Sequence, residues 1–269
     1  MQKIKENIYV ESESSVCNTG VVVTTEGVVV IDTPMAPTSA KKLVEDIAGF
    51  GPVRYVINTE PHTDHFAGNC YFSGITVAHE GARERILAAK SEDVSGMLQW
   101  MSPDNLPLDK EFRFRPPEIT FSDNLTFYLG ALTFRLIHMP GHTPYSLVIY
   151  IPEEKIVFTS DNVNLGTPVF RDSDPVKWLE SLEKCGELDV DEVVPGHGVV
   201  CDKSCFGQMS TLVRSWIDIV ANAVNKGLSL EQALEEVPKA EMFAQMPSEG
   251  PGAGFLRMNI EKIYQFLKK

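Results

Sequence analysis

Short apolar runs separated by Gly, Pro and polar residues recur along most of the chain up to Gly198. Runs rich in Val and Ile with such boundaries are typical of buried β-strands. The pattern predicts strands over residues 7–11, 17–24, 28–32, 53–57, 75–78, 125–129, 132–137, 146–151, 156–159 and 192–194. Apolar residues at helical spacing predict helices over residues 38–48, 79–90 and 174–185. Strands and helices that alternate in this way predict an α/β fold.

Residues 91–117 follow neither the strand nor the helix period. Met97, Trp100 and Met101 lie there among several prolines. A long apolar loop of this kind either has a function or packs as an arm on the rest of the protein. We hypothesise that it covers a substrate site and that Trp100 and Met101 contribute an apolar wall. Packing on the core and a dimer contact are the alternatives.

The chain changes character beyond Gly198. Helical spacing predicts a helix over residues 206–226, a second one from Ser229 and a last one over residues 255–267, after a flexible Gly-rich stretch over 248–254. We therefore predict a first domain over residues 1–200 and a C-terminal helical extension over residues 201–269 that packs on it. This extension either closes the site or builds a homodimer.

The charge of the chain limits the classes of partner. A formal net charge of -13 argues against nucleic acid as substrate, because phosphates need a basic surface. The charge favours a neutral or small substrate. The sequence shows no run long enough to cross a membrane and no secretory signal at its start. The 5 cysteines do not form a secreted disulfide framework, so we expect a cytoplasmic protein that does not bind membranes.

The chemistry concentrates in residues 59–69, directly after the predicted strand 53–57. Glu60, His62, Asp64 and His65 occur there within six positions. Imidazole and carboxylate groups are the ligands that divalent metals take. In an extended segment, side chains two positions apart share a side, so we expect Glu60, His62 and Asp64 to converge. His65 then points elsewhere, which suits a second metal.

Three later strands end in the same way. His142, Asp161 and His197 each follow an apolar strand, and glycines flank the two histidines so that the backbone can turn tightly. Sites in α/β sheets assemble outside such strand ends. His79 and His138 are expected to have capping or core roles instead. Asp32, at the end of a strand, is expected either to support the ligand loop or to cap a turn.

The residues Glu60-x-His62-x-Asp64-His65, followed by Gly141-His142-Thr143, Asp161 and Gly196-His197, resemble the metallo-β-lactamase superfamily. The family's first motif is H-x-H-x-D-H, and the resemblance covers about residues 7–198. It implies a four-layer αββα sandwich of two mixed β-sheets, and a dinuclear site at one edge. It further implies that His62 and His142 hold one metal, that Asp64, His65 and His197 hold the other, and that Asp161 bridges them. By family the two divalent ions are zinc.

Glu60 departs from this pattern, because the family usually has histidine there. A carboxylate adds negative charge to the site and favours iron or manganese over zinc. The alternative is that Glu60 points away and the metal beside it is weakly bound or absent.

These residues predict a metal-dependent hydrolase in which a hydroxide shared by the metals attacks a small acyl substrate (an ester, thioester, lactone or amide). Asp64 would orient the hydroxide. Thr143 and Tyr145 would bind the oxyanion, or else serve only the local turn. There are two alternative functions. One is a redox protein with a di-iron site that resembles the centres of flavodiiron proteins, and the other is an inactive metal-binding module.

Overall fold

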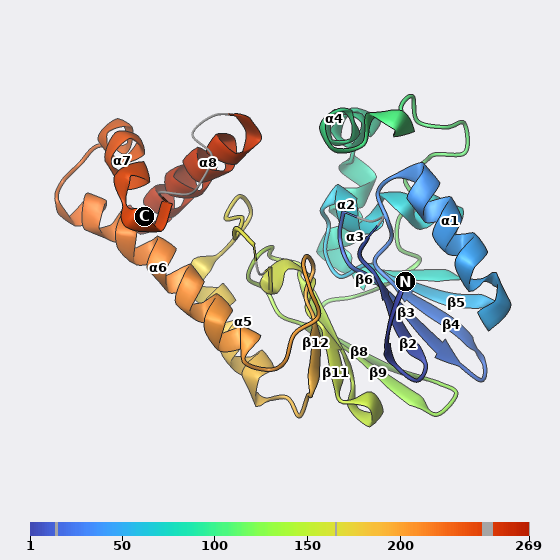
Figure 1. Ribbon diagram of the computed structural model, residues 1–269. Helices are drawn as coiled ribbons and strands as arrows, with labels where there is room; N and C mark the ends of the chain where they lie inside the picture. Colours follow the sequence, from blue (N-terminus) through green and yellow to red (C-terminus); the bar gives the residue numbers. More distant parts are fainter. Residues whose placement is uncertain (14–15, 165, 244–249, 269) are drawn as a thin grey trace.

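The computed structural model describes residues 1–13, 16–164, 166–243 and 250–268, and within these ranges the strands form two mixed β-sheets (Figure 1). The first sheet has the order β1–β2–β3–β4–β5–β6–β7 and the second the order β12–β11–β10–β9–β8. The strands of the first sheet are β1 (Gln2–Lys5), β2 (Ile8–Glu11), β3 (Thr19–Thr24), β4 (Gly27–Ile31), β5 (Val53–Ile57), β6 (Ile75–His79) and β7 (Ile119–Phe121). Those of the second are β8 (Asn124–Leu129), β9 (Leu132–His138), β10 (Leu147–Ile151), β11 (Ile156–Phe158) and β12 (Glu192–Val194).

Strand β4 is a continuous apolar run because hydrophobic clusters pack on both of its faces. Val29 and Ile31 belong to the cluster between the two sheets, which also contains Phe134 of β9. Val28 and Val30 belong to a different cluster, beneath helix α1. Because successive side chains of a strand point to opposite faces, a continuous apolar run indicates a strand that is buried on both sides.

Helices cover the outer faces of the two sheets. α1 (Pro37–Ile47) packs on the first sheet through its buried residues, Leu43 among them. α5 (Pro175–Glu187) packs on the second, where its Trp178 shares a cluster with Val157 of β11. The order helix, sheet, sheet, helix confirms the predicted αββα sandwich (Figure 1).

The C-terminal helices extend the layer of α5. These are α6 (Cys205–Asn225), α7 (Leu230–Glu236) and α8 (Gly250–Leu267), and their buried side chains share one hydrophobic cluster with α5 and the second sheet. α8 begins before the predicted residue 255. Residues 248–249 of the predicted flexible stretch lie outside the described residues, and the rest of that stretch is helical. The division at residue 200 remains a prediction.

Residues 91–117 are not one long loop, as predicted, because they begin with helix α4 (Ser91–Met101). Val94 and Leu98, four residues apart, are buried in a cluster with Met35 and Ala67. The opposite side of α4 carries exposed Trp100. A helix that is apolar on two faces has no clear amphipathic period, which is why the pattern missed it. The irregular stretch after α4 packs on the same cluster through Phe112 and Phe114.

The sequence pattern also misses the edge strands β1 and β7. β1 is largely exposed and β7 is only 3 residues long, so neither carries a strong apolar signal. Among the described helices, none is both long and apolar enough to cross a membrane.

Candidate metal centre

The predicted metal ligands converge from four segments, each of which follows a strand at one end of the sandwich. Glu60 and His62 lie directly after β5, and Asp64 and His65 lie on the short helix α2 (Thr63–Phe66). The remaining ligands are His142 between β9 and β10, Asp161 after β11 and His197 after β12. Within the described residues their side-chain atoms form three groups, each with all of its atoms within 4.8 Å of one another.

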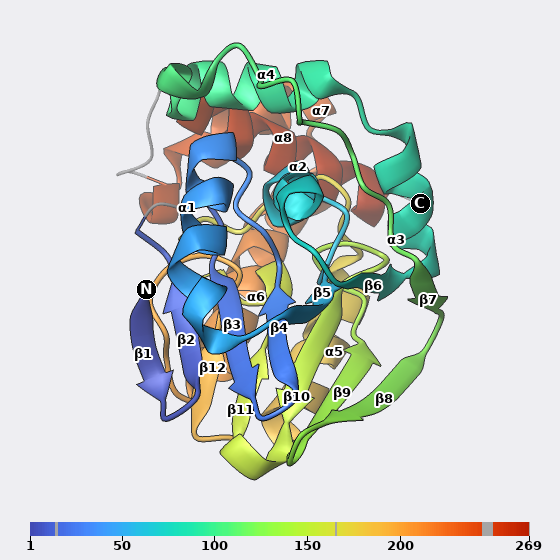
Figure 2. The ribbon, with the colours of Figure 1, turned by 90° about the vertical axis from the view of Figure 1, so that its right-hand side faces the viewer.

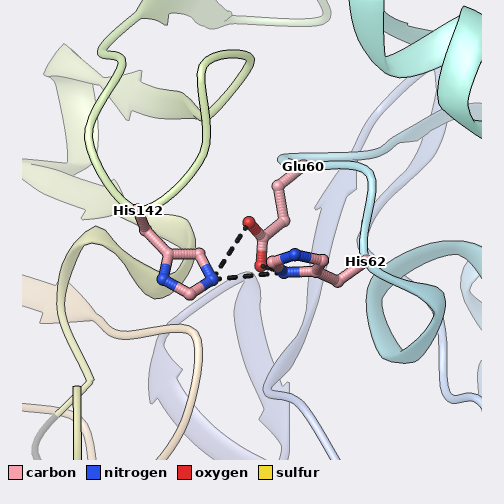
Figure 3. Close-up of side chains that lie close together, drawn as sticks. All are labelled: Glu60, His62 and His142. Atoms are coloured by element: carbon pink, nitrogen blue, oxygen red, sulfur yellow. Dashed lines mark hydrogen bonds and ion pairs between the residues drawn. The ribbon is translucent and has the colours of Figure 1, made fainter. Parts of the chain in front are cut away.

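Glu60, His62 and His142 form the first set of ligand atoms (Figure 3). His142 Nε2 lies 3.1 Å from His62 Nδ1 and 3.6 Å from Glu60 Oε2. Glu60 Oε1 lies 3.3 Å from His62 Nδ1. Glu60 therefore points into the centre and not away from it.

Asp64, His65 and His197 form the second set. Asp64 Oδ2 lies 3.2 Å from His197 Nε2 and 3.7 Å from His65 Nε2. Asp64 lies in the same centre as Glu60 and His62 but in the other set of ligand atoms, because the extended path expected for all three residues ends at His62. A helical turn begins at Thr63 and places Asp64 with His65.

Asp161 lies between the two sets. Its Oδ1 is 3.3 Å from His197 Nε2 and 3.5 Å from His65 Nε2. Its Oδ2 is 3.7 Å from His142 Nε2. The resemblance implies this placement for a bridging carboxylate. Ser160, directly before it, has a φ of 56°, a left-handed conformation at the point where the chain turns into the centre.

Buried polar atoms without hydrogen bonds test whether these residues fit a metal. Among the described residues, both carboxylate oxygens of Glu60, Nε2 of His65 and Oδ1 of Asp161 are buried with no hydrogen-bond partner. They approach charged neighbours at ion-pair distance but not with hydrogen-bond geometry. Such atoms are costly to bury unless a cation pairs with them. Converging imidazole nitrogens and carboxylate oxygens fit divalent metals.

The pKa values of His62 and His197 reflect the surrounding negative charge, whereas burial lowers the pKa of His142. Burial alone would lower the pKa of His62, but Glu60 and Asp172 raise it to about 9. Burial also opposes a charge on His197, and the nearby carboxylates, Asp161 above all, raise its pKa to about 11. The centre therefore favours positive charge, whether that of protons or of metal ions.

Asp32 supports the ligand loop, which is the first of its two expected roles. Its Oδ2 lies 2.9 Å from His65 Nδ1. The same carboxylate accepts hydrogen bonds from the backbone N–H and the hydroxyl of Thr59. Asp32 therefore ties the ring of His65 to the loop that begins with Thr59.

Two further groups orient the imidazole rings of His62 and His197. Asp172 Oδ2 lies 3.1 Å from His62 Nε2, and the carbonyl oxygen of Val16 lies 2.8 Å from His197 Nδ1. Carboxylate and carbonyl partners of this kind fix which ring nitrogen faces a metal. His142 is held through its backbone instead, because its N–H donates a hydrogen bond to Asn162 Oδ1. Asp172 was not predicted, because a single Asp in a polar loop carries no recognisable signal in the sequence.

The glycines beside the histidines serve close packing as well as turning. A Cβ at Gly196 would lie 1.9 Å from Asp161 Oδ1, and one at Gly141 would lie 2.7 Å from Asn162 Oδ1. Only Gly198 of these has a positive φ, 93°. The expectation of tight turns thus holds for Gly198, whereas Gly141 and Gly196 leave room for the side chains of the centre.

A cavity of about 360 Å³ opens onto the centre, with His62, Asp64, His142, Asp161 and His197 in its lining. α4 and α8 lie at the same end of the molecule in both views (Figure 1, Figure 2). α4 contributes Met97, Trp100 and Met101 to the walls, and α8 contributes Phe255. Trp100 and Met101 are 61% and 43% exposed. Met97, Trp100 and Met101 belong to the stretch for which an apolar wall was hypothesised, whereas Phe255 was expected only as part of a C-terminal helix and was not predicted to line the site.

Thr143 and Tyr145 do not belong to the lining of this cavity. Thr143 Oγ1 lies 2.9 Å from Ser146 Oγ within its own turn. The Tyr145 ring stacks on His79, with centroids 5.3 Å apart. His79 itself caps helix α3 (Glu80–Ala88) by accepting a hydrogen bond from the backbone N–H of Gly81. Both side chains thus make local contacts in this structure, and oxyanion binding by them stays a prediction.

Residues 14–197 match the family model described as the metallo-beta-lactamase superfamily. This range covers more than half of the chain and contains every predicted ligand. The chain belongs to the metallo-beta-lactamase superfamily. As members of this superfamily are metal-dependent hydrolases that bind divalent metals, the converging His, Asp and Glu side chains are a candidate metal site.

Within the superfamily, the chain is similar to proteins of several activities. It is 24% identical to a linear primary-alkylsulfatase from Pseudomonas sp. (strain ATCC 19151), over 89% of this chain and 53% of that protein. It is 28% identical to an acyl-coenzyme A thioesterase from Homo sapiens, over 52% of this chain and 54% of that one. The chain thus spans about half the length of these curated relatives.

Solved structures of the superfamily share the fold. A metallo-beta-lactamase from Pontibacter korlensis matches with a TM-score of 0.63 and 21% identity, over 79% of this chain and 97% of that one. A stereoselective inverting sec-alkylsulfatase from Pseudomonas sp. matches with a TM-score of 0.73 and 18% identity, over 98% of this chain and 49% of that one.

Proposed function

We propose that the protein is a dinuclear metal-dependent hydrolase that acts on a small acyl substrate with an apolar group. One observation carries the proposal: buried ligand atoms that lack hydrogen bonds converge at the floor of a cavity whose walls are apolar. The ligand atoms account for metal binding, and the walls account for the apolar part of a substrate.

The residues of the two sets would hold the metals. Glu60, His62 and His142 would bind one ion, Asp64, His65 and His197 the other, and Asp161 would contact both. Divalent ions at such positions lower the pKa of water toward about 7 and polarise the bond to be cleaved. Zinc is favoured by family, and iron or manganese by the carboxylate of Glu60.

The chain itself would position the reactants. Asp64 lines the cavity, so its carboxylate can accept a hydrogen bond from the attacking water and orient it. Met97 and Trp100 would hold the apolar group of the substrate and exclude other water from the reacting carbonyl.

A substrate panel tests this function. We expect esters, thioesters, lactones or amides to be cleaved, and Asp64→Asn to lose most of that turnover. Asp189→Asn is the matched control, because Asp189 is exposed and pairs only with Lys155 among the ion pairs of the described residues. Faster cleavage of phosphodiesters than of acyl compounds would contradict the proposal.

Hydrolysis of alkyl sulfates is the second candidate function. It is favoured by the similarity to alkylsulfatases, one of which matches the fold over 98% of this chain. Arg171 is a cavity-lining cation that could face a sulfate, beside an apolar wall that could take the alkyl chain. Release of sulfate from octyl sulfate at a higher kcat/KM than hydrolysis of octanoate esters would select this candidate.

Metal content separates these hydrolases from the other two hypotheses. Two irons after anaerobic purification, together with oxygen reduction and no hydrolysis, would select a redox protein. Fewer than one metal per chain would select an inactive binding module.

A further inference from the structure

The carboxylate of Glu60 faces ligands of both sets, not only of its own. Its Oε1 lies 3.3 Å from His62 Nδ1 in the first set and 3.0 Å from His65 Nε2 in the second. Its Oε2 lies 3.6 Å from His142 Nε2, again in the first set (Figure 3). Glu60 is therefore grouped with His65 and Asp161 as closely as with His62 and His142.

Asp161 has the same relation to the two sets. One of its oxygens faces His65 and His197, and the other faces His142. Both carboxylates, Glu60 and Asp161, thus have oxygen atoms beside histidines of both sets. The resemblance to the family accounts for Asp161, but not for a second carboxylate in this arrangement.

Burial favours a cation on each side of Glu60. The residue is fully buried, and among the described residues neither of its carboxylate oxygens has a hydrogen-bond partner. A metal bound only beside His62 and His142 would leave Oε1 facing His65 without a cation between them. Buried charge is tolerated when it is paired on all sides, so cations on both sides of Glu60 satisfy it better.

We propose that Glu60 is a second bridging carboxylate, shared by both metal positions alongside Asp161. This inference rests on the proposed dinuclear centre and assigns Glu60 a role that a histidine could not fill, since an imidazole presents one donor nitrogen to the centre. Sharing makes the two positions interdependent, so that loss of Glu60 weakens metal binding at both. An additional bridging oxygen ligand also favours iron or manganese.

The test removes a ligand of the first set, so that metal binding by the second set can be measured alone. His62→Ala should leave one zinc ion, held by Asp64, His65 and His197 together with the shared carboxylates of Asp161 and Glu60. The Kd of this ion is measured by competition with a chromophoric chelator. Adding Glu60→Gln, a change of nearly equal size, should raise that Kd at least about ten-fold, because even groups that only support a metal ligand contribute this much. Adding His142→Gln instead is the matched control and should change the Kd less than about three-fold, since His142 belongs to the first set.

The inference is overturned if Glu60→Gln leaves the Kd of the remaining zinc as unchanged as His142→Gln does. Glu60 would then be a terminal ligand of the first position, and the proposed hydrolase function would stand. If the unaltered protein binds fewer than two zinc ions, the dinuclear centre and the bridging role fail together. Circular dichroism and the cobalt(II) spectrum of each variant check the fold and the coordination independently of activity.

Discussion

Single residues decide the geometry of the candidate centre. Gly196 is an example, because there is no space for a side chain at this position. Its Cα lies against the carboxylate of Asp161, so that any side chain at this position must displace the carboxylate that lies between the two ligand sets. The glycine next to His197 therefore leaves room for the side chain of Asp161, which lies 35 positions earlier in the chain.

We expect Gly196→Ala to weaken metal binding about ten-fold or more, because the added Cβ would lie 1.9 Å from Asp161 Oδ1. The measurement is the zinc Kd of purified, chelator-treated protein. Gly207→Ala is the control, since nothing lies within 4 Å of a Cβ there and its place in α6 favours alanine. Equal metal affinity in the two variants would show that Asp161 does not hold a metal.

Asp172 offers a second prediction at this scale. Its carboxylate holds His62 Nε2, so that Nδ1 faces Glu60 and His142. Asp172→Asn should weaken binding of the first metal roughly 10–100-fold, as is typical for loss of a carboxylate partner of a ligating histidine. Asp172→Glu should restore part of the affinity. If both variants bind metal as the unaltered protein does, Asp172 does not position His62.

At the scale of elements, α4 has two faces with different roles. Leu98 is buried on the core side, whereas Trp100 is exposed and lines the cavity. The two residues are only two positions apart, yet they lie on opposite sides of the helix. The same helix therefore anchors the cavity wall and forms it.

Trp100→Ala should lower kcat/KM about ten-fold for substrates with an apolar group, the size expected for loss of one apolar contact of roughly 1–3 kcal/mol, with metal content intact. Tyr128→Ala, which removes an aromatic ring that is 73% exposed on β8, is the control. Leu98→Ala should instead lower the free energy of unfolding by about 2–5 kcal/mol. Unchanged kinetics in Trp100→Ala together with an altered oligomeric state on a sizing column would make α4 an interface and not a wall.

The elements also show which features the sequence could predict. β4 and its neighbours were predictable because a continuous Val-rich run is typical of strands buried on both faces. α4 was not, because its apolar residues occur on both sides of the helix and hide its period. The ligand types in residues 59–69 were evident, but the helical turn from Thr63 regrouped them, since local backbone geometry and not residue spacing decides which side chains meet. The role of Asp172 could not be predicted, because its contact with His62 joins residues 110 positions apart along the chain, and no local pattern reveals such a contact.

At the scale of the whole molecule, a chain of aromatic rings joins the C-terminal helices to the centre. His142 contacts Trp178, which contacts Phe170, and Phe170 contacts Trp216 of α6. Trp216 lies in turn against Phe243. The C-terminal helices therefore share a core with the second sheet, although the sequence suggests a boundary near residue 200.

We expect Trp216→Ala to lower the free energy of unfolding by about 3–5 kcal/mol, because the ring is fully buried in this shared core. Unfolding should remain one transition by both circular dichroism and tryptophan fluorescence. Val199→Ala, at a residue that is 75% exposed, should change it by less than about 0.5 kcal/mol. Two separate transitions would show that residues 201–269 form an independent unit.

The metal-to-protein ratio of the purified protein, measured by inductively coupled plasma mass spectrometry, tests the dinuclear centre most directly. We expect two divalent ions per chain in the unaltered protein. In Asp64→Ala we expect at most one ion, with most of the turnover lost, because one ligand of the second set is gone. A ratio below one in the unaltered protein, after both aerobic and anaerobic purification, would contradict a dinuclear hydrolase. So would an Asp64→Ala protein that keeps its full metal content and its full rate.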